Sequence, residues 1–355
     1  MKETLLLLHF GSCLLAGPAL AEETSAQLPA LGANLAQTSV SGISSGGFMA
    51  AQIAAAYSAR FMGVGVIAAG PYFCAGTYPA VSLEANATAT CMTPASPETA
   101  ANGDISYENA KLFADAGLID PVKQLARQRV YLFSGANDQT VKTPVVDAVQ
   151  RFYYLAGVPE DALRYVKHAL AGHAIVTANR NHLACEASSA PYINNCGFIQ
   201  SQELLRHIYP AKRQAASTGP LDGDLVSFDQ REFIKGKRSS MDDVGYAYIP
   251  RYCRANSCAV HVAFHGCRQG ARVIDSAFYS GTGYNEYADS NALIIVYPQA
   301  HPSETIPANP RGCWDFWGYS SDDPRKPDFY TRHGAQMSAV MAMIERLGQP
   351  AAVKP

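Results

Sequence analysis

The chain has 355 residues, of which 48% are hydrophobic and 16% are charged, so it holds enough apolar residues to bury a large core. Its formal net charge is -2 and it has no basic cluster, which argues against a nucleic acid as its partner. Beyond the N-terminal region, no stretch is long and apolar enough to span a membrane.

The chain opens with the pattern of an export signal. A basic start precedes the apolar run from Leu5 to Leu15, and small residues ending at Ala21 form an A-x-A-type cleavage site. We therefore expect residues 1–21 to be a signal peptide. Residues 22–355 would then be exported to the periplasm or the extracellular space.

The next feature is a G-x-S-x-G box, Gly42-Ile43-Ser44-Ser45-Gly46, with Ser44 at its centre. Residues 35–41 favour a short strand before it, and the Ala-rich residues 47–57 favour a helix after it. A sharp turn from strand to helix that exposes a serine is the nucleophile elbow of α/β-hydrolases. The box alone occurs often by chance, but this context predicts a catalytic Ser44.

Strands and helices alternate along the rest of the chain. This alternation predicts an α/β fold with a mostly parallel sheet and helices on both faces. A loop pinned by disulfides is expected at 71–102, and a polar, Gly-rich segment at 211–240 joins the two halves of what we interpret as one domain, 22–355. The further strands are expected at 61–69, 129–134, 163–167, 258–264 and 292–297, and the further helices at 106–116, 143–156, 284–290 and 329–347.

Eight of the nine cysteines follow the predicted signal peptide, and an even number in an exported protein indicates disulfides. The sequence leaves their connectivity open. If each cysteine pairs with its nearest neighbour in the sequence, the disulfides are Cys74–Cys91, Cys185–Cys196, Cys253–Cys258 and Cys267–Cys313.

A nucleophilic serine needs a base, a carboxylate that orients the base, and donors for the oxyanion. In α/β-hydrolases these follow the order Ser, acid, His, each after a strand. Asp138 follows the strand at 129–134, and His173 follows the strand at 163–167. They are the predicted acid and base, against the alternatives of a turn-forming aspartate and an ordinary loop histidine.

A second oxyanion donor usually lies before the nucleophile, where this chain has no suitable turn. His265-Gly266-Cys267 offers such a turn late in the chain, after the strand at 258–264. A circular permutation of the fold would explain why this donor comes late in the chain. The late strands would then supply the half of the sheet that usually comes first. We expect the backbone amides of Ser45 and Cys267 to form the oxyanion hole.

Cys253, Cys258, His261 and His265 superficially resemble a zinc site. Export favours disulfides instead, and the C-x4-C spacing is loose. We therefore expect neither a metal nor a cofactor.

Three motifs in this order, G-I-S-S-G-G, A-F-H-G-C-R-Q-G and N-P-R-G-C-W-D-F-W-G-Y, make the chain resemble the exported poly(3-hydroxybutyrate) depolymerases whose catalytic domain is a circularly permuted α/β-hydrolase. The resemblance covers residues 33–348. It matches Ser44, Asp138 and His173 to the triad and the amides of Ser45 and Cys267 to the oxyanion hole.

The same resemblance implies that Asn309 and Trp314 line a polymer-binding crevice, and that the chain has no separate polymer-binding domain. The implied activity is that of a serine esterase cleaving 3-hydroxyalkanoate polyester or oligomers through an acyl-enzyme. Two alternatives stay open: a feruloyl or acetylxylan esterase on the same scaffold, and a non-catalytic binding protein. For Trp314 the alternative is a buried packing role.

Overall fold

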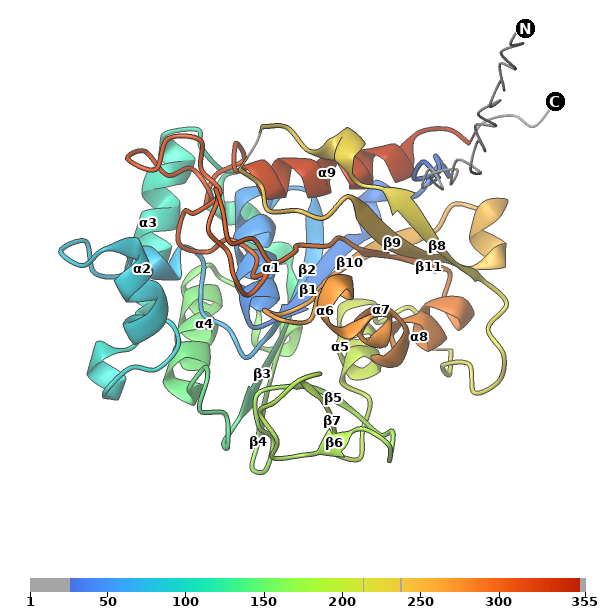
Figure 1. The fold of residues 1–355 in the computed structure, drawn as a ribbon, viewed down its shortest axis with the longest axis horizontal. Coiled ribbons are helices and arrows are strands. Elements are labelled where there is room, and N and C mark those ends of the chain that lie inside the picture. The colour runs from blue at the N-terminus through green and yellow to red at the C-terminus, as the bar shows by residue number, and fades with distance from the viewer. Residues whose placement is uncertain (1–25, 213, 237, 352–355) are drawn as a thin grey trace, which may run out of the picture.

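A single eight-stranded sheet organises the protein, and helices cover both of its faces (Figure 1). The structure is a computed structural model that describes residues 26–212, 214–236 and 238–351. The predicted signal peptide, residues 1–21, lies outside the described residues.

The strands follow the order β4-β3-β2-β1-β10-β11-β9-β8 across the sheet. All pairs from β4 to β11 are parallel, whereas β9 runs antiparallel to both β11 and β8. This is the mostly parallel sheet that the sequence predicts. The strands are β1 (Thr38–Ile43), β2 (Phe61–Ile67), β3 (Arg129–Gly135), β4 (Leu163–His168), β8 (Asp224–Asp229), β9 (Val244–Ile249), β10 (Ala259–Phe264) and β11 (Leu293–Tyr297).

The sheet order agrees with the expected circular permutation. β1 is the first strand of the chain but lies in the middle of the sheet, between β2 and β10. Strands from the second half of the chain complete one side of the sheet. The N-terminal segment lies against the end of the last helix, because the backbone N–H groups of Leu31 and Ala33 donate to the carbonyl of Leu347 at 3.1 and 3.0 Å.

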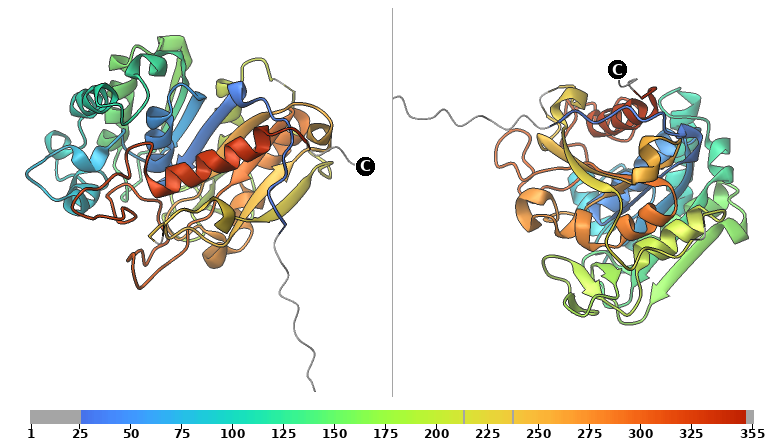
Figure 2. Two further views of the ribbon diagram at one scale, coloured as in Figure 1. Left: turned by 90° about the horizontal axis from the view of Figure 1, so that it is seen from above. Right: turned by 90° about the vertical axis from the view of Figure 1, so that its right-hand side faces the viewer.

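The helices lie on both faces of the sheet, with α5 and α8 on the side opposite α9 (Figure 2). Residues of β1, β2, β10 and β11 are almost all buried, so the core lies between the centre of the sheet and these helices. The helices are α1 (Ser45–Ala56), α2 (Leu83–Ala85), α3 (Gly103–Asp115), α4 (Thr143–Leu155), α5 (Gln200–Ile208), α6 (Ala271–Ile274), α7 (Ala277–Gly281), α8 (Tyr284–Ser290) and α9 (Ala335–Gly348).

The structure contains elements that the sequence pattern does not predict. The segment 211–240 contains β8, an edge strand in which only Phe228 is fully buried. Because its other residues are largely exposed, the strand cannot be recognised from an apolar pattern in the sequence. A second, three-stranded sheet of β5 (Ile175–Thr177), β7 (Ile193–Asn195) and β6 (Leu183–Ala184) follows His173.

The eight cysteines form four disulfides. The pairs are those of nearest-neighbour closure: Cys74–Cys91, Cys185–Cys196, Cys253–Cys258 and Cys267–Cys313.

Asn86-Ala87-Thr88 has the pattern of an N-glycosylation sequon, and folding buries its asparagine. The Asn86 side chain is buried, and its amide donates to the carbonyls of Tyr78 and Val81 at 2.9 and 3.2 Å. A glycan on this nitrogen would require local unfolding.

Candidate active site

Ser44 stands at a strained turn between β1 and α1. Its backbone has φ 55° and ψ -128°, a conformation that non-glycine residues rarely adopt. The flanking positions have no room for a side chain. A Cβ at Gly42 would lie 2.2 Å from the Gly46 carbonyl oxygen, and one at Gly46 would lie 2.4 Å from the His265 carbonyl oxygen. The turn therefore has the geometry of the predicted nucleophile elbow.

Asp138 and His173 form a buried pair. Asp138 Oδ2 lies 2.7 Å from His173 Nδ1, and both residues are buried. The other oxygen, Oδ1, accepts the backbone N–H groups of Thr140 and Val141, each at 2.8 Å, so the carboxylate is held in one orientation. A charged acceptor at Nδ1 favours the tautomer with the proton on that nitrogen, which leaves Nε2 as the basic atom.

The loops that carry these residues follow β3 and β4, as the sequence predicts. The Asp138 N–H donates to the carbonyl of Gly135, the last residue of β3. The His173 N–H donates to Ser188 Oγ at 2.9 Å, which fixes the histidine against the loop before β7.

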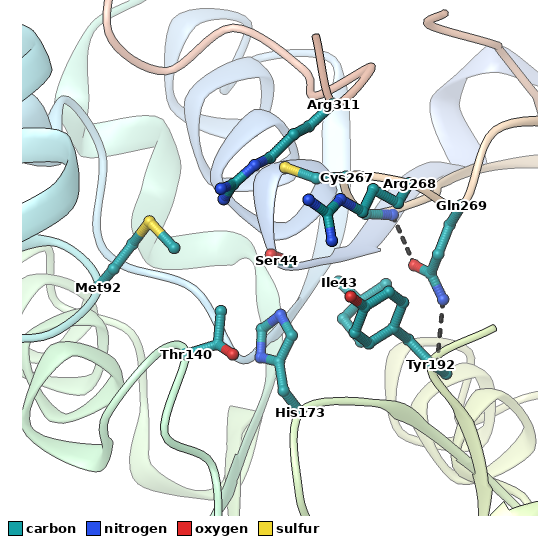
Figure 3. A pocket seen from close by; sticks show the side chains of 11 residues that line it. Ile43, Ser44, Met92, Thr140, His173, Tyr192, Cys267, Arg268, Gln269 and Arg311 are labelled. Atoms are coloured by element: carbon teal, nitrogen blue, oxygen red, sulfur yellow. Dashed lines mark hydrogen bonds between the residues drawn. The ribbon is translucent and has the colours of Figure 1, made fainter. Parts of the chain in front are cut away.

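Ser44 and His173 line one pocket of about 140 Å³, and the imidazole points toward the serine (Figure 3). The pocket brings together the elbow, the loops after β3 and β4, and the turn after β10. Its remaining lining residues are Ile43, Met92, Thr140, Tyr192, Gly266, Cys267, Arg268, Gln269 and Arg311.

The turn after β10 lies directly beside the elbow. A Cβ at Gly266 would lie 3.2 Å from the Cβ of Ser44. Among the described residues, neither the Ser45 nor the Cys267 backbone N–H donates a hydrogen bond to another protein group. Both amides therefore remain available to an oxygen bound next to Ser44.

Two side chains to which the sequence pattern assigns no role hold this turn. Gln269 Oε1 accepts the Gly266 N–H at 2.7 Å, and its Nε2 donates to the carbonyls of Pro191 and Tyr192 at 2.9 and 3.1 Å. His265 Nε2 accepts the Ala300 N–H at 3.1 Å, which leaves Nδ1 to donate to the Gly266 carbonyl at 2.7 Å. The only signal for either residue was its place in the H-G-C-R-Q-G motif.

Burial of His265 lowers its pKa to about 4, which keeps the ring neutral and preserves this donor–acceptor arrangement. The disulfide Cys267–Cys313 adds a covalent link, with its two Cα atoms 4.2 Å apart. It ties the turn to the segment that contains Arg311.

Asn309 and Trp314, which the resemblance places in a substrate crevice, do not line this pocket. Trp314 is fully buried, and its ring packs against the rings of Phe264 and His265. Asn309 is also buried, and neither side chain lines the pocket.

Asn309 uses its amide within the protein. Its Nδ2 donates to Ser240 Oγ and to the Cys313 carbonyl at 3.1 and 2.9 Å, while its Oδ1 accepts the Cys313 N–H at 2.9 Å. Asn309 thus shapes the turn that leads to the disulfide.

The superficially zinc-like residues do not form a metal site. Cys253 and Cys258 are joined in a disulfide, and His261 is held between Ser39 Oγ and Ser41 Oγ at 2.6 and 2.8 Å. His265 belongs to the turn described above. Within the described ranges, the one cluster of three possible ligands is His168, Cys185 and Cys196, whose cysteines are paired with each other.

The described part of the chain contains no helix with the length and apolar character that a membrane crossing requires.

No protein-family model matches the chain. It is 39% identical over 324 residues to "Poly(3-hydroxybutyrate) depolymerase" of Delftia acidovorans, a match that covers 90% of this chain but spans only 61% of that relative's length. It is 34% identical over 343 residues to "Polyhydroxybutyrate depolymerase" of Talaromyces funiculosus, which covers 92% of this chain and 94% of that protein.

A solved structure has the same fold. It is a serine-to-alanine variant of a PHB depolymerase in complex with an R3HB trimer, with a TM-score of 0.79 and 33% sequence identity. The match covers 91% of this chain and 100% of that one. This similarity shows that the chain and the solved structure share the α/β-hydrolase type of fold.

Proposed function

Because the chain belongs to the poly(3-hydroxybutyrate) depolymerase family, we propose that it is a serine esterase that hydrolyses 3-hydroxybutyrate polyester or its oligomers. The observation that carries the proposal is the convergence of Ser44 and His173 in one pocket, with Asp138 buried behind the histidine. No metal or cofactor enters the proposed reaction.

In the first step, Ser44 Oγ attacks the ester carbonyl carbon while His173 Nε2 takes the serine proton. Asp138 stabilises the imidazolium that forms. The backbone amides of Ser45 and Cys267 donate to the oxyanion of the tetrahedral intermediate. The intermediate collapses, the C–O bond breaks, and His173 gives the proton to the leaving alkoxide oxygen, which departs as a hydroxyl group.

In the second step, water replaces the leaving group. His173 takes a proton from the water, the hydroxide oxygen attacks the acyl carbon, and Ser44 leaves with the proton returned by His173. The balance is one ester and one water consumed, and one alcohol and one carboxylic acid formed.

We further propose that residues 22–355 form one catalytic domain and that the protein is exported. The sheet and helices described above belong to one core, which supports a single domain. Four disulfides support export to an oxidising compartment, since disulfides are rare where thiols are kept reduced.

The direct test is release of soluble 3-hydroxybutyrate from amorphous polymer and from the trimer, measured by chromatography, with acetylated xylan and a feruloyl ester as competing substrates. The proposal predicts 3-hydroxyacid release that Ser44→Ala reduces by about 10³-fold or more. Release of acetate or ferulate without any 3-hydroxyacid would contradict it.

A further inference from the structure

The pocket beside Ser44 contains two arginines that the proposed reaction does not use. Arg268 and Arg311 both line it, and both are exposed residues. Figure 3 shows their guanidinium groups directed toward the space over Ser44 from the side opposite His173. The proposed chemistry needs an oxyanion hole, a base and an acid, and none of these roles falls to the two arginines.

The two arginines are held as a pair by the backbone. The Arg268 N–H donates to the Arg311 carbonyl at 2.7 Å, and the disulfide Cys267–Cys313 joins the same two turns. Arg268 has φ 62°, a backbone conformation that non-glycine residues rarely adopt, so the surrounding structure must hold this turn in place. These constraints place both side chains at the same mouth of the pocket.

The positive charge at this mouth is not balanced locally. Among the described residues, neither guanidinium group takes part in a hydrogen bond or ion pair with a protein side chain, and none of the pocket-lining residues is acidic. The carboxylate of Asp138 is buried and is occupied by His173 and two backbone amides. The pair is therefore free to bind an anion.

An internal segment of a polyester has no charge. The anionic group of a 3-hydroxyacid oligomer is its terminal carboxylate, which lies on the alcohol side of every ester bond in the oligomer. A guanidinium group binds a carboxylate with two parallel N–H···O bonds, a geometry that a single ester carbonyl cannot match. The pocket encloses about 140 Å³, well below the several hundred Å³ of sites for larger ligands, so it fits a short unit beside Ser44.

We propose that Arg268 and Arg311 bind the terminal carboxylate of the substrate, so that the enzyme selects ester bonds close to the carboxylate end of an oligomer. The inference rests on the proposed function and deepens it. It makes short oligomers with a free carboxylate the preferred substrates and makes the released monomer a 3-hydroxyacid from the leaving side. The arginines are specificity-determining residues here.

The experiment compares two substrates that differ at this end group: the 3-hydroxybutyrate dimer as free acid and the same dimer as its carboxyl methyl ester. Chromatography follows cleavage of the internal ester bond, so hydrolysis of the methyl ester is not counted. The readout is the ratio of their kcat/KM values for wild type, Arg268→Gln, Arg311→Gln and the double variant. Arg180→Gln is the matched control, since Arg180 is exposed and lies outside the pocket. Thermal unfolding shows that each variant is folded.

Wild type and Arg180→Gln should prefer the free acid by about tenfold or more, since the methyl ester lacks the charge that both guanidinium groups bind. The ratio should fall stepwise to about one in the double variant, and salt should also reduce it. A wild-type enzyme that hydrolyses both dimers equally would overturn the inference while leaving the proposed function standing. An unchanged ratio in the double variant would overturn it as well.

A second pair, 3-acetoxybutyrate and its methyl ester, separates the inference from the proposed function. It keeps the carboxylate on the leaving side but contains no second 3-hydroxybutyrate unit. An arginine-dependent preference for 3-acetoxybutyrate, without hydrolysis of either dimer, would support carboxylate binding and contradict the polyester substrate. No preference in either pair would overturn carboxylate binding.

Discussion

Asp138 Oδ2 lies 2.7 Å from His173 Nδ1, while the second carboxylate oxygen of Asp138 is held by two backbone amides. The carboxylate cannot turn without breaking those bonds. It therefore fixes the tautomer and the direction of the imidazole, and it leaves Nε2 as the atom that faces the pocket.

Asp138→Asn should lower kcat by about 10³- to 10⁴-fold, because an amide nitrogen at this position would favour the wrong histidine tautomer. The change preserves side-chain shape, so thermal unfolding should show a folded protein. The measurement is kcat on p-nitrophenyl butyrate. A variant that keeps more than about a tenth of wild-type turnover would remove Asp138 from the proposed triad.

Gln269→Leu should lower kcat by about 10- to 100-fold with a smaller change in KM. The reason is that Gln269 joins the Gly266 amide to the carbonyls of Pro191 and Tyr192, so its loss lets the turn bearing the Cys267 amide shift. Gln37→Leu is the control, since Gln37 is exposed and outside the pocket. If Gln269→Leu raised KM alone, the residue would contact substrate and would not position the turn.

The elbow and the residues of the proposed triad could be located from the sequence because their signals are local. Ser44 is marked by the box and its flanking elements, and Asp138 and His173 each follow a recognisable strand. The supports of the turn after β10 were not predictable in this way. Gln269 and His265 act through Pro191 and Ala300, whose proximity arises only on folding.

Burial was the other property that the sequence did not reveal. A resemblance transfers the identity of Asn309 and Trp314, but not whether their side chains face a pocket or the core. The strand β8 is not recognisable in the sequence for a related reason, since an edge strand with polar residues lacks an apolar pattern.

Trp314→Ala should lower stability by about 3–5 kcal/mol, because it leaves a large cavity beside Phe264 and His265. Turnover of the 3-hydroxybutyrate trimer and of p-nitrophenyl butyrate should then fall by the same factor. The measurement is urea unfolding together with both activities. A loss confined to the trimer, at unchanged stability, would show that Trp314 contacts the substrate after all.

Stability should fall as the pH drops below about 6.5. Burial lowers the pKa of His261 to about 3 and that of His265 to about 4, from the ordinary histidine value of 6.5. Below pH 6.5 the unfolded chain therefore binds protons that the folded chain does not, and this difference favours unfolding until the folded pKa values are reached.

Urea unfolding at pH 7.5 and pH 5.0 measures this effect. We expect a free energy of unfolding lower by a few kcal/mol at pH 5.0. His261→Gln should keep polar contacts to Ser39 and Ser41 while removing the titrating ring, so its decrease should be smaller. An identical decrease in wild type and variant would exclude His261 as a source of the acid sensitivity.

Covalent labelling by a fluorophosphonate tests whether Ser44 is the nucleophile. Intact mass followed by peptide mapping should show one adduct, located on Ser44, and Ser44→Ala should remain unlabelled while folded. The amount of adduct should match the loss of esterase activity. Labelling of a different serine, or an unlabelled wild-type protein, would show that Ser44 is not the nucleophile.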